Sequence, residues 1–382
     1  MISINYPKDY ERYYFEMEYL NQLDILKLER NFNKLKKVYP VLIHISIKKI
    51  LLSDIKELFN LSEFINSLIT LERIKSTYIP KKSQFEEKLK EVFNYDDKKI
   101  GATYQNNIKQ FFEQNVPMKT CYYCNLDFIN SFNDTYDYHD ALDFVKKASI
   151  DELCKIKDVT KPLAKKIYSQ KTIINSIDDL TNPSVLQKSN LKDVILKEKH
   201  SHFTLDHVID KGTHPLLSLS LYNFVPSCYA CNSKFKGTKQ FINRNTVNYL
   251  SPTLDEKDFK FDEDVKFRIL FKSNNHISYI KSKKDFILDF KYFKNQAEYE
   301  KYIDIFKLKG RYIFHKDEIV ELIEKKKKYS DSKIEEMSKQ LKIPIQKIKE
   351  DIFGKELFQG NLEDKSMTKF KRDIARQIGI IK

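Results

Sequence analysis

Residues 205–237 read LDHVIDKGTHPLLSLSLYNFVPSCYACNSKFKG and gather several side chains that could do chemistry. Asp206 stands beside His207, and Asn232 follows twenty-five residues after the histidine. Mg²⁺ prefers oxygen ligands and keeps several of its waters. The carboxylate of Asp206 and the amide oxygen of Asn232 could therefore hold a catalytic Mg²⁺ or Mn²⁺ and leave room for a phosphate. Such an ion stabilises the transition state of phosphodiester hydrolysis and the leaving oxygen.

Two further properties of this stretch complete the predicted site. His207 has the chemistry of a general base, because an unperturbed imidazole, with a pKa of about 6.5, takes a proton from water at neutral pH. Asn223, sixteen residues later, is a poor acid or base. Its amide can instead hydrogen-bond backbone groups and brace a loop. The predicted catalytic set is Asp206, His207, Asn223 and Asn232.

Four of the five cysteines form two C-x-x-C pairs, Cys121/Cys124 and Cys228/Cys231. Zinc prefers four ligands in a tetrahedron, and each C-x-x-C turn offers two of them. The 103 residues between the pairs exceed an ordinary zinc-finger loop. The entropy of closing a loop grows only with the logarithm of its length, so a folded insertion is tolerable. We expect one structural Zn²⁺ held by all four thiolates; core cysteines or a redox pair are the alternatives.

Composition favours an anionic partner. The chain has 382 residues and a net charge of +14, and nucleic acid is the usual partner of so basic a protein. Lysine as the default surface residue is the alternative interpretation. No run of about 18 apolar residues occurs, so we expect no membrane span, and the first residues carry no secretion signal. We therefore expect a cytoplasmic protein.

The pattern of apolar residues predicts the elements that position these groups. Apolar residues at helical spacing fill the N-terminal part, and alternating residues in VKFRILF and HISYIKS predict a β-hairpin. The predicted fold class is α+β, mostly helical, around a small zinc-stapled core. The expected parts are a helical domain (1–116), a nuclease domain (117–250) with a helical insertion (141–199), and a hairpin followed by a helical domain (251–382).

The order of both cysteine pairs, Asp-His, Asn and C-x-x-C-N resembles the HNH endonucleases, over about 120–130 and 202–239. Their ββα-metal core is treble-clef-like. The resemblance implies a metal-dependent DNA endonuclease in which Asp206 binds the metal, His207 is the general base and Asn223 is structural. Asn232 matches the third motif residue, a metal ligand, where Asn replaces the His of the family name.

More narrowly, the stretch looks like a bacterial HNH subgroup associated with defence against phage. That resemblance implies an antiviral effector that could act with a partner defence protein. Two alternatives stay open. The chain could be a zinc-scaffolded adaptor that binds DNA without cutting it, or it could be an RNase.

The insertion resembles a helix–hairpin–helix module, a non-specific DNA-binding element. Its hairpin departs from the usual Gly-x-Gly, because Asp158 stands where a glycine would adopt an unusual φ and expose amides to phosphate. A helical hairpin that only packs on the core is the alternative. The lysines expected to contact nucleic acid are Lys161, Lys165 and Lys166 of the insertion, and Lys234 and Lys236 after the second cysteine pair.

Overall fold

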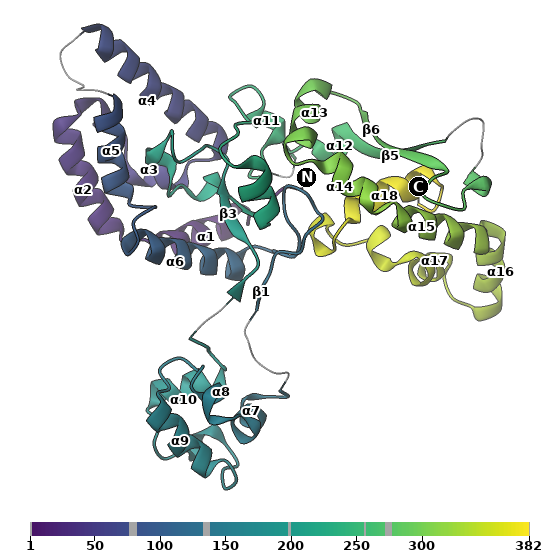
Figure 1. Ribbon diagram of the computed structural model, residues 1–382, viewed down its shortest axis with the longest axis horizontal. Helices are drawn as coiled ribbons and strands as arrows, with labels where there is room; N and C mark the ends of the chain where they lie inside the picture. Colours follow the sequence, from purple (N-terminus) through teal and green to yellow (C-terminus); the bar gives the residue numbers. More distant parts are fainter. Residues whose placement is uncertain are drawn as a thin grey trace. The chain divides into compact units, whose positions relative to one another are not determined.

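The computed structural model describes residues 2–75, 82–132, 138–197, 200–255, 257–271 and 277–381, without the side chains of 68–75, 82 and 83. The chain is mixed α+β and mostly helical (Figure 1), which confirms the predicted class in its coarse form. It forms two compact units. One unit comprises Met1–Asn130 and Phe203–Lys382, and the other comprises Ser131–His202. The predicted insertion, 141–199, lies within the second unit.

The N-terminal part of the first unit is helical, as its periodicity predicts. Its helices are α1 (Asp9–Asn21), α2 (Ile25–Val38), η1 (Pro40–Leu42), α3 (Ile47–Leu52), α4 (Ile55–Lys75), α5 (Lys82–Phe93) and α6 (Ile100–Asn115). Aspartate side chains cap the N-termini of two of these helices, α2 and α4. Asp24 accepts the backbone N–H of Lys27 at 3.0 Å, and Asp54 accepts that of Glu57 at 2.9 Å. These caps satisfy amide groups that the first helical turn leaves unpaired.

The first cysteine pair lies on a short turn of the first unit, and in the second pair Cys228 precedes η5 while Cys231 lies within it. Around the first pair, an antiparallel bridge joins Thr120 to Phe128. The second pair follows a hairpin in which β3 (Thr204–His207) pairs with β4 (Phe224–Ser227), with His207 opposite Phe224. The connection holds η3 (Pro215–Leu217) and η4 (Leu221–Asn223), and β4 leads into the π-helical segment η5 (Ala230–Lys236).

The second unit has its own core, built from Leu153, Ile156, Ala164, Ile167, Leu180 and their neighbours. Its elements are β1 (Ser131–Phe132), α7 (Ala141–Lys147), α8 (Ile150–Leu153), α9 (Lys161–Gln170), η2 (Ile177–Asp179), α10 (Val185–Lys192) and β2 (His200–Ser201). Asp158 lies between α8 and α9 with φ +64°, the conformation that glycine adopts most easily. Its carboxylate accepts the amide of buried Asn190 at 3.1 Å. A side chain at Asp158 therefore does not prevent the turn.

The C-terminal part contains a β-hairpin and helices. Its elements are α11 (Val247–Leu250), α12 (Phe261–Asp264), β5 (Val265–Phe271), η6 (Ile277–Tyr279), β6 (Phe286–Tyr292), α13 (Gln296–Ile305), α14 (Leu308–Phe314), α15 (Lys316–Lys328), α16 (Asp331–Leu341), α17 (Ile345–Phe353), η7 (Lys355–Leu357), η8 (Leu362–Asp364) and α18 (Thr368–Gln377). The first predicted strand, VKFRILF, is β5. The second prediction, HISYIKS, begins at His276, which lies outside the described residues, and over 277–282 it is wrong: Ile277–Tyr279 form η6, and β5 pairs with β6, in the register Val265 to Tyr292. The reason is that β6 buries Phe286, Leu288 and Phe290 on one face.

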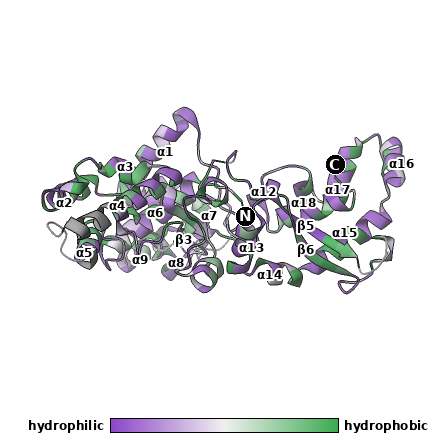
Figure 2. Cartoon of the chain, turned by 90° about the horizontal axis from the view of Figure 1, so that it is seen from above, coloured by the Kyte–Doolittle hydropathy of each residue, from purple (hydrophilic) through white to green (hydrophobic). Residues whose placement is uncertain are grey.

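Three parts of the first unit meet at the first cysteine turn. The backbone N–H of Ile2 donates to the carbonyl of Tyr122 at 3.1 Å. The hydroxyl of Tyr302 donates to the carbonyl of Tyr123 at 3.0 Å, and Tyr312 donates to Cys124 at 2.7 Å. Figure 2 shows apolar and polar residues alternating around the helices, as amphipathic packing requires. Within the described ranges, no helix has the length and hydropathy to cross a bilayer.

Candidate active site and metal centre

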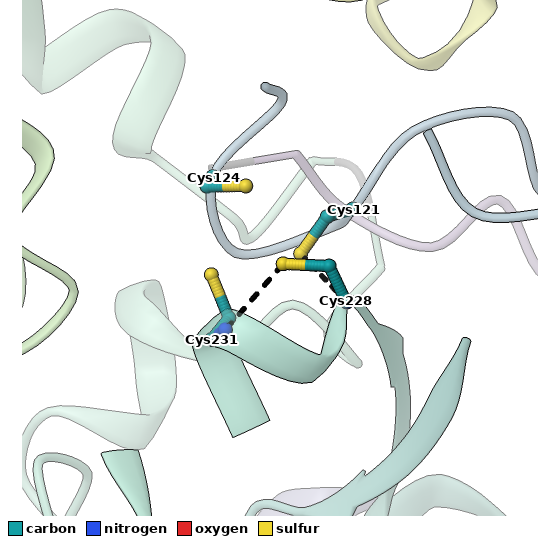
Figure 3. Close-up of side chains that lie close together, drawn as sticks. All are labelled: Cys121, Cys124, Cys228 and Cys231. Atoms are coloured by element: carbon teal, nitrogen blue, oxygen red, sulfur yellow. Dashed lines mark hydrogen bonds between the residues drawn. The ribbon is translucent and has the colours of Figure 1, made fainter. Parts of the chain in front are cut away.

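The four cysteines of the two C-x-x-C pairs come together although 103 residues separate the pairs. All four are buried, and their sulfur atoms lie within 4.8 Å of one another (Figure 3). The backbone N–H of Cys228 donates to the sulfur of Cys121 at 3.3 Å, and that of Cys231 donates to Cys228 at 3.4 Å. Four buried sulfurs at this separation could hold a metal ion such as zinc, which confirms that the predicted ligands assemble.

Arg311 of α14 contacts this cluster, a role that the sequence did not indicate. Its guanidinium donates to the sulfur of Cys231 at 3.2 Å and of Cys124 at 3.4 Å, and it pairs with Asp127 at 2.8 Å. Burial opposes the charge, but the sulfurs raise the pKa of Arg311 above its usual range. A zinc ion with four thiolates would carry a net charge of −2, and Arg311, from the C-terminal part, would compensate part of that charge.

Three of the four predicted catalytic residues line one cavity of about 440 Å³. They are Asp206 and His207 at the end of β3 and Asn232 of η5. The same wall includes four residues that bring an aromatic ring and positive charge, namely Tyr95, Lys109, Lys211 and Lys236. Tyr95 follows α5 and Lys109 lies on α6, so the N-terminal helices complete a pocket that the hairpin begins.

The imidazole of His207 is held in one orientation. Its Nε2 lies 2.9 Å from the backbone oxygen of Ser218. Because a carbonyl only accepts, Nε2 carries the proton, and Nδ1 of the neutral ring keeps its lone pair. The ring packs against Tyr95 and Phe224, with centroids at 4.9 and 4.8 Å. Burial, with a contribution from the Lys211 charge, lowers the pKa of His207 to about 4, so the ring is a neutral acceptor at pH 7.

Asn223 does not line the pocket; it braces the loop that fixes His207. The side chain is fully buried and donates to the backbone oxygens of Ile209 and Leu217, each at 3.0 Å. Its Oδ1 accepts the backbone N–H of Ile209 at 2.7 Å. Leu217 directly precedes Ser218, whose carbonyl orients His207. The hydrogen bonds are of the kind that the sequence predicts for this residue.

Replacing Asn223 by alanine should therefore lower the free energy of unfolding by about 2–4 kcal/mol, because it leaves the buried N–H and carbonyl of Ile209 unpaired and removes one of the two hydrogen bonds to the carbonyl of Leu217. Chemical denaturation followed by circular dichroism measures the loss. Asn245→Ala, at an exposed position, is the matched control and should stay within about 0.5 kcal/mol of the wild type. Equal stability of the two variants would contradict the bracing role.

The structure corrects the expectation that the side chain of Lys236 is exposed. We expected it on an exposed face of the segment after the cysteines, free to reach phosphate, but its side chain is only 4% exposed. Its ammonium lies 3.0 Å from Oδ1 of Asp206 and 2.9 Å from the backbone oxygen of His207. The reason is that a buried carboxylate needs a partner, and Lys236 comes about one helical turn after Asn232.

Both oxygens of Asp206 are engaged. Oδ1 pairs with Lys236, and Oδ2 accepts the hydroxyl of Tyr123 at 2.6 Å. Burial raises the pKa of Asp206, while the charge of Lys236 and the Tyr123 hydrogen bond oppose that rise. Asn232 donates through Nδ2 to Thr204 at 2.8 Å, and its Oδ1 has no hydrogen-bond partner among the described residues. Two oxygen donors of the predicted kind thus face one pocket. A divalent ion does not fit beside Asp206 while Lys236 stays there.

The other predicted contacts to nucleic acid lie on exposed side chains. Lys234 is exposed, 5.8 Å from the ring centre of Phe235. In the second unit, Lys161, Lys165 and Lys166 of α9 are exposed, and Lys161 lies 4.0 Å from Asp151. Exposure is compatible with binding to phosphate and equally with an ordinary solvated helix face. Their contact with nucleic acid stays a prediction.

The low pKa of His207 predicts acid destabilisation. The unfolded chain binds a proton near the ordinary pKa of 6.5, whereas the folded chain binds it only near about 4. Protonation therefore favours the unfolded state, and stability falls as the pH drops from about 6.5 to about 4, by about 3 kcal/mol in total. Urea unfolding at pH 7 and pH 5 measures this. His207→Gln should flatten the pH dependence, and His44→Gln, at an exposed position, should not. Equal pH dependence in the wild type and His207→Gln would refute the assignment.

Several contributors to the site lie outside the motif. Tyr95 and Arg311 come from separate segments, whereas Tyr123 stands inside the first C-x-x-C pair, and no sequence signal pointed to any of the three. A sequence signal did exist for Lys236. Residues four apart share a helix face, so its spacing from Asn232 placed it on the same side.

A search of family models, of curated proteins and of solved structures found no match for this chain.

Proposed function

We propose that this chain hydrolyses phosphodiester bonds of DNA at the pocket formed by Asp206, His207 and Asn232, as an HNH-type endonuclease. One observation carries the proposal. His207 lines a pocket with Nε2 tied to the carbonyl of Ser218, so that its neutral Nδ1 is the ring atom left to take a proton.

The chemistry follows from these groups. Nδ1 of His207 accepts a proton from water, and the water oxygen forms a bond to phosphorus. The bond from phosphorus to the leaving sugar oxygen breaks, and that oxygen takes a proton from solvent water. The negative charge that develops on the phosphoryl oxygens would be stabilised by the ammonium groups of Lys109, Lys211 and Lys236, which line the pocket together with the carboxylates of Asp96, Asp206 and Asp210. The resemblance implies a catalytic Mg²⁺ or Mn²⁺ on Asp206 and Asn232, which requires Lys236 to leave Asp206 first.

Net charge and the resemblance favour DNA as the substrate, with contacts to phosphate that are salt-sensitive and poor in sequence information. The exposed lysines of α9 could add such contacts from the second unit. A role in bacterial defence against phage, with a partner protein, follows from the resemblance alone and stays a prediction. The same holds for a cytoplasmic location.

The test is incubation of the purified chain with supercoiled plasmid and with single-stranded RNA, at low salt, with and without Mg²⁺ or Mn²⁺. A nuclease converts the plasmid to nicked or linear forms, and His207→Ala does not. His44→Ala, at an exposed position of the same unit, is the matched control and should cut like the wild type. A DNA shift without cleavage in every variant identifies the adaptor alternative. Cleavage of RNA alone identifies an RNase.

A further inference from the structure

The most unusual feature of the candidate site is a buried ion pair in the place where the sequence motif calls for a metal. The side chains of Lys236 and Asp206 are 4% and 5% exposed, and their charged atoms lie 3.0 Å apart. A buried charge is tolerated only when it is paired and hydrogen-bonded, and both residues meet this condition. Tyr123 donates to the second oxygen of Asp206, and Lys236 also donates to the backbone of His207.

The backbone fixes Lys236 in this position. The second cysteine pair begins η5, and the N–H of Gly237 donates to the carbonyl of Asn232 at 2.8 Å, which closes a π-helical turn. Such turns are rare and are frequently found at functional sites. Lys236 therefore projects from a segment that the zinc ligands anchor, and its long side chain is not free to sample solvent.

An ammonium offers three N–H donors, and the described contacts use two of them. Among the described residues, no third acceptor is bonded to Lys236, and this side chain lines the pocket. The remaining donor is thus suited to an oxygen of a phosphate that enters beside His207. A fixed ammonium of this kind stabilises a phosphoryl group without any exchange of ligands.

We propose that Lys236 is the resident cation of this site: it excludes a divalent ion from Asp206 and itself contacts the phosphoryl group. The statement about cleavage rests on the proposed function, whereas the exclusion of metal from Asp206 does not. The chain then cuts DNA without Mg²⁺ or Mn²⁺, and zinc has only a structural role.

The first experiment measures metal binding and needs no activity. The free-ion electron paramagnetic resonance signal of Mn²⁺ is titrated with the zinc-loaded chain. Asp206→Asn serves as the blank for all other sites on the surface. We expect the wild type and Asp206→Asn to bind Mn²⁺ equally. Lys236→Met, which keeps an unbranched side chain one atom shorter and removes its charge, should gain one site at least about 100-fold tighter, because like charges at contact distance repel strongly. Asp206→Asn in the Lys236→Met background should remove that site.

The possible results of the Mn²⁺ titration either support the proposal or overturn it. A wild-type Mn²⁺ site that Asp206→Asn removes would overturn the proposal, and so would a folded Lys236→Met variant that gains no site. Zinc content and a melting curve establish that the variant folds. Should Lys236→Met fail to fold, the comparison of the wild type with Asp206→Asn decides alone: equal binding supports the exclusion of metal and unequal binding refutes it.

The second experiment measures cleavage of supercoiled plasmid in EDTA, with zinc counted by mass spectrometry afterwards. We expect the wild type to keep its rate within about threefold, since its catalytic charges come from side chains. Cleavage that depends on added Mg²⁺ overturns the proposal. If no DNA is cut under any condition while the Mn²⁺ result holds, the proposed function and the contact to phosphate fail, and the exclusion of metal from Asp206 stands.

Discussion

Replacing His207 by alanine is expected to lower the rate of DNA cleavage by about 10²–10⁴-fold, the usual contribution of a general base. The expectation rests on geometry. Nε2 is committed to the carbonyl of Ser218, and burial keeps the ring neutral at pH 7. No other described histidine lines the pocket. Water would then have to lose its proton without an acceptor at the reacting atoms.

The measurement is the initial rate of plasmid nicking, with zinc content and melting temperature recorded for each variant. The pH profile adds a readout that a packing role would not change. With the pKa of His207 at about 4, the wild-type rate should stay level through pH 6.5 and fall only as the pH approaches 4. A His207→Ala variant that folds and still cuts within threefold of the wild type would remove the general base from the mechanism.

The second large effect concerns the metal centre. Cys231→Ser should release the metal and lower the free energy of unfolding by on the order of 5 kcal/mol or more, because the binding free energy of a structural zinc contributes directly to folding. Cys231 lies in η5, and its sulfur lies close to the sulfurs of Cys121 and Cys124 in the first C-x-x-C pair. Arg311, from the C-terminal part, donates a hydrogen bond to the sulfur of Cys231. Loss of this ligand should therefore loosen the pocket as well, and abolish DNA cleavage.

Cys154→Ser is the matched control, because Cys154 is the fifth cysteine, is half-buried and belongs to the other compact unit. Native mass spectrometry should count one zinc per chain in the wild type and in Cys154→Ser, and none in Cys231→Ser. Full zinc content and unchanged stability in Cys231→Ser would show that the four sulfurs do not form a structural metal site.

Part of the site could be predicted because its residues are close in sequence or carry a strong spacing. The strand β5 could be predicted because its alternation of apolar and polar residues can be recognised without knowing its partner. The partner strand was predicted in the wrong stretch of the sequence. Two neighbouring stretches alternate similarly, and only β6 has the apolar residues to cover the core.

The sequence by itself determined which atoms are available: four thiolates in two knuckles, and a carboxylate, an imidazole and two amides in one order. It also determined the helical class and the presence of an insertion, because periodicity and spacing are local properties of the chain. Only the tertiary structure decided how these groups are used. Lys236 turns inward onto Asp206, Asn223 braces the loop of Ser218, and Arg311 bonds to two sulfurs from eighty residues or more away. Each of these depends on burial, since a charge or an amide removed from water takes whichever partner the packing brings within reach.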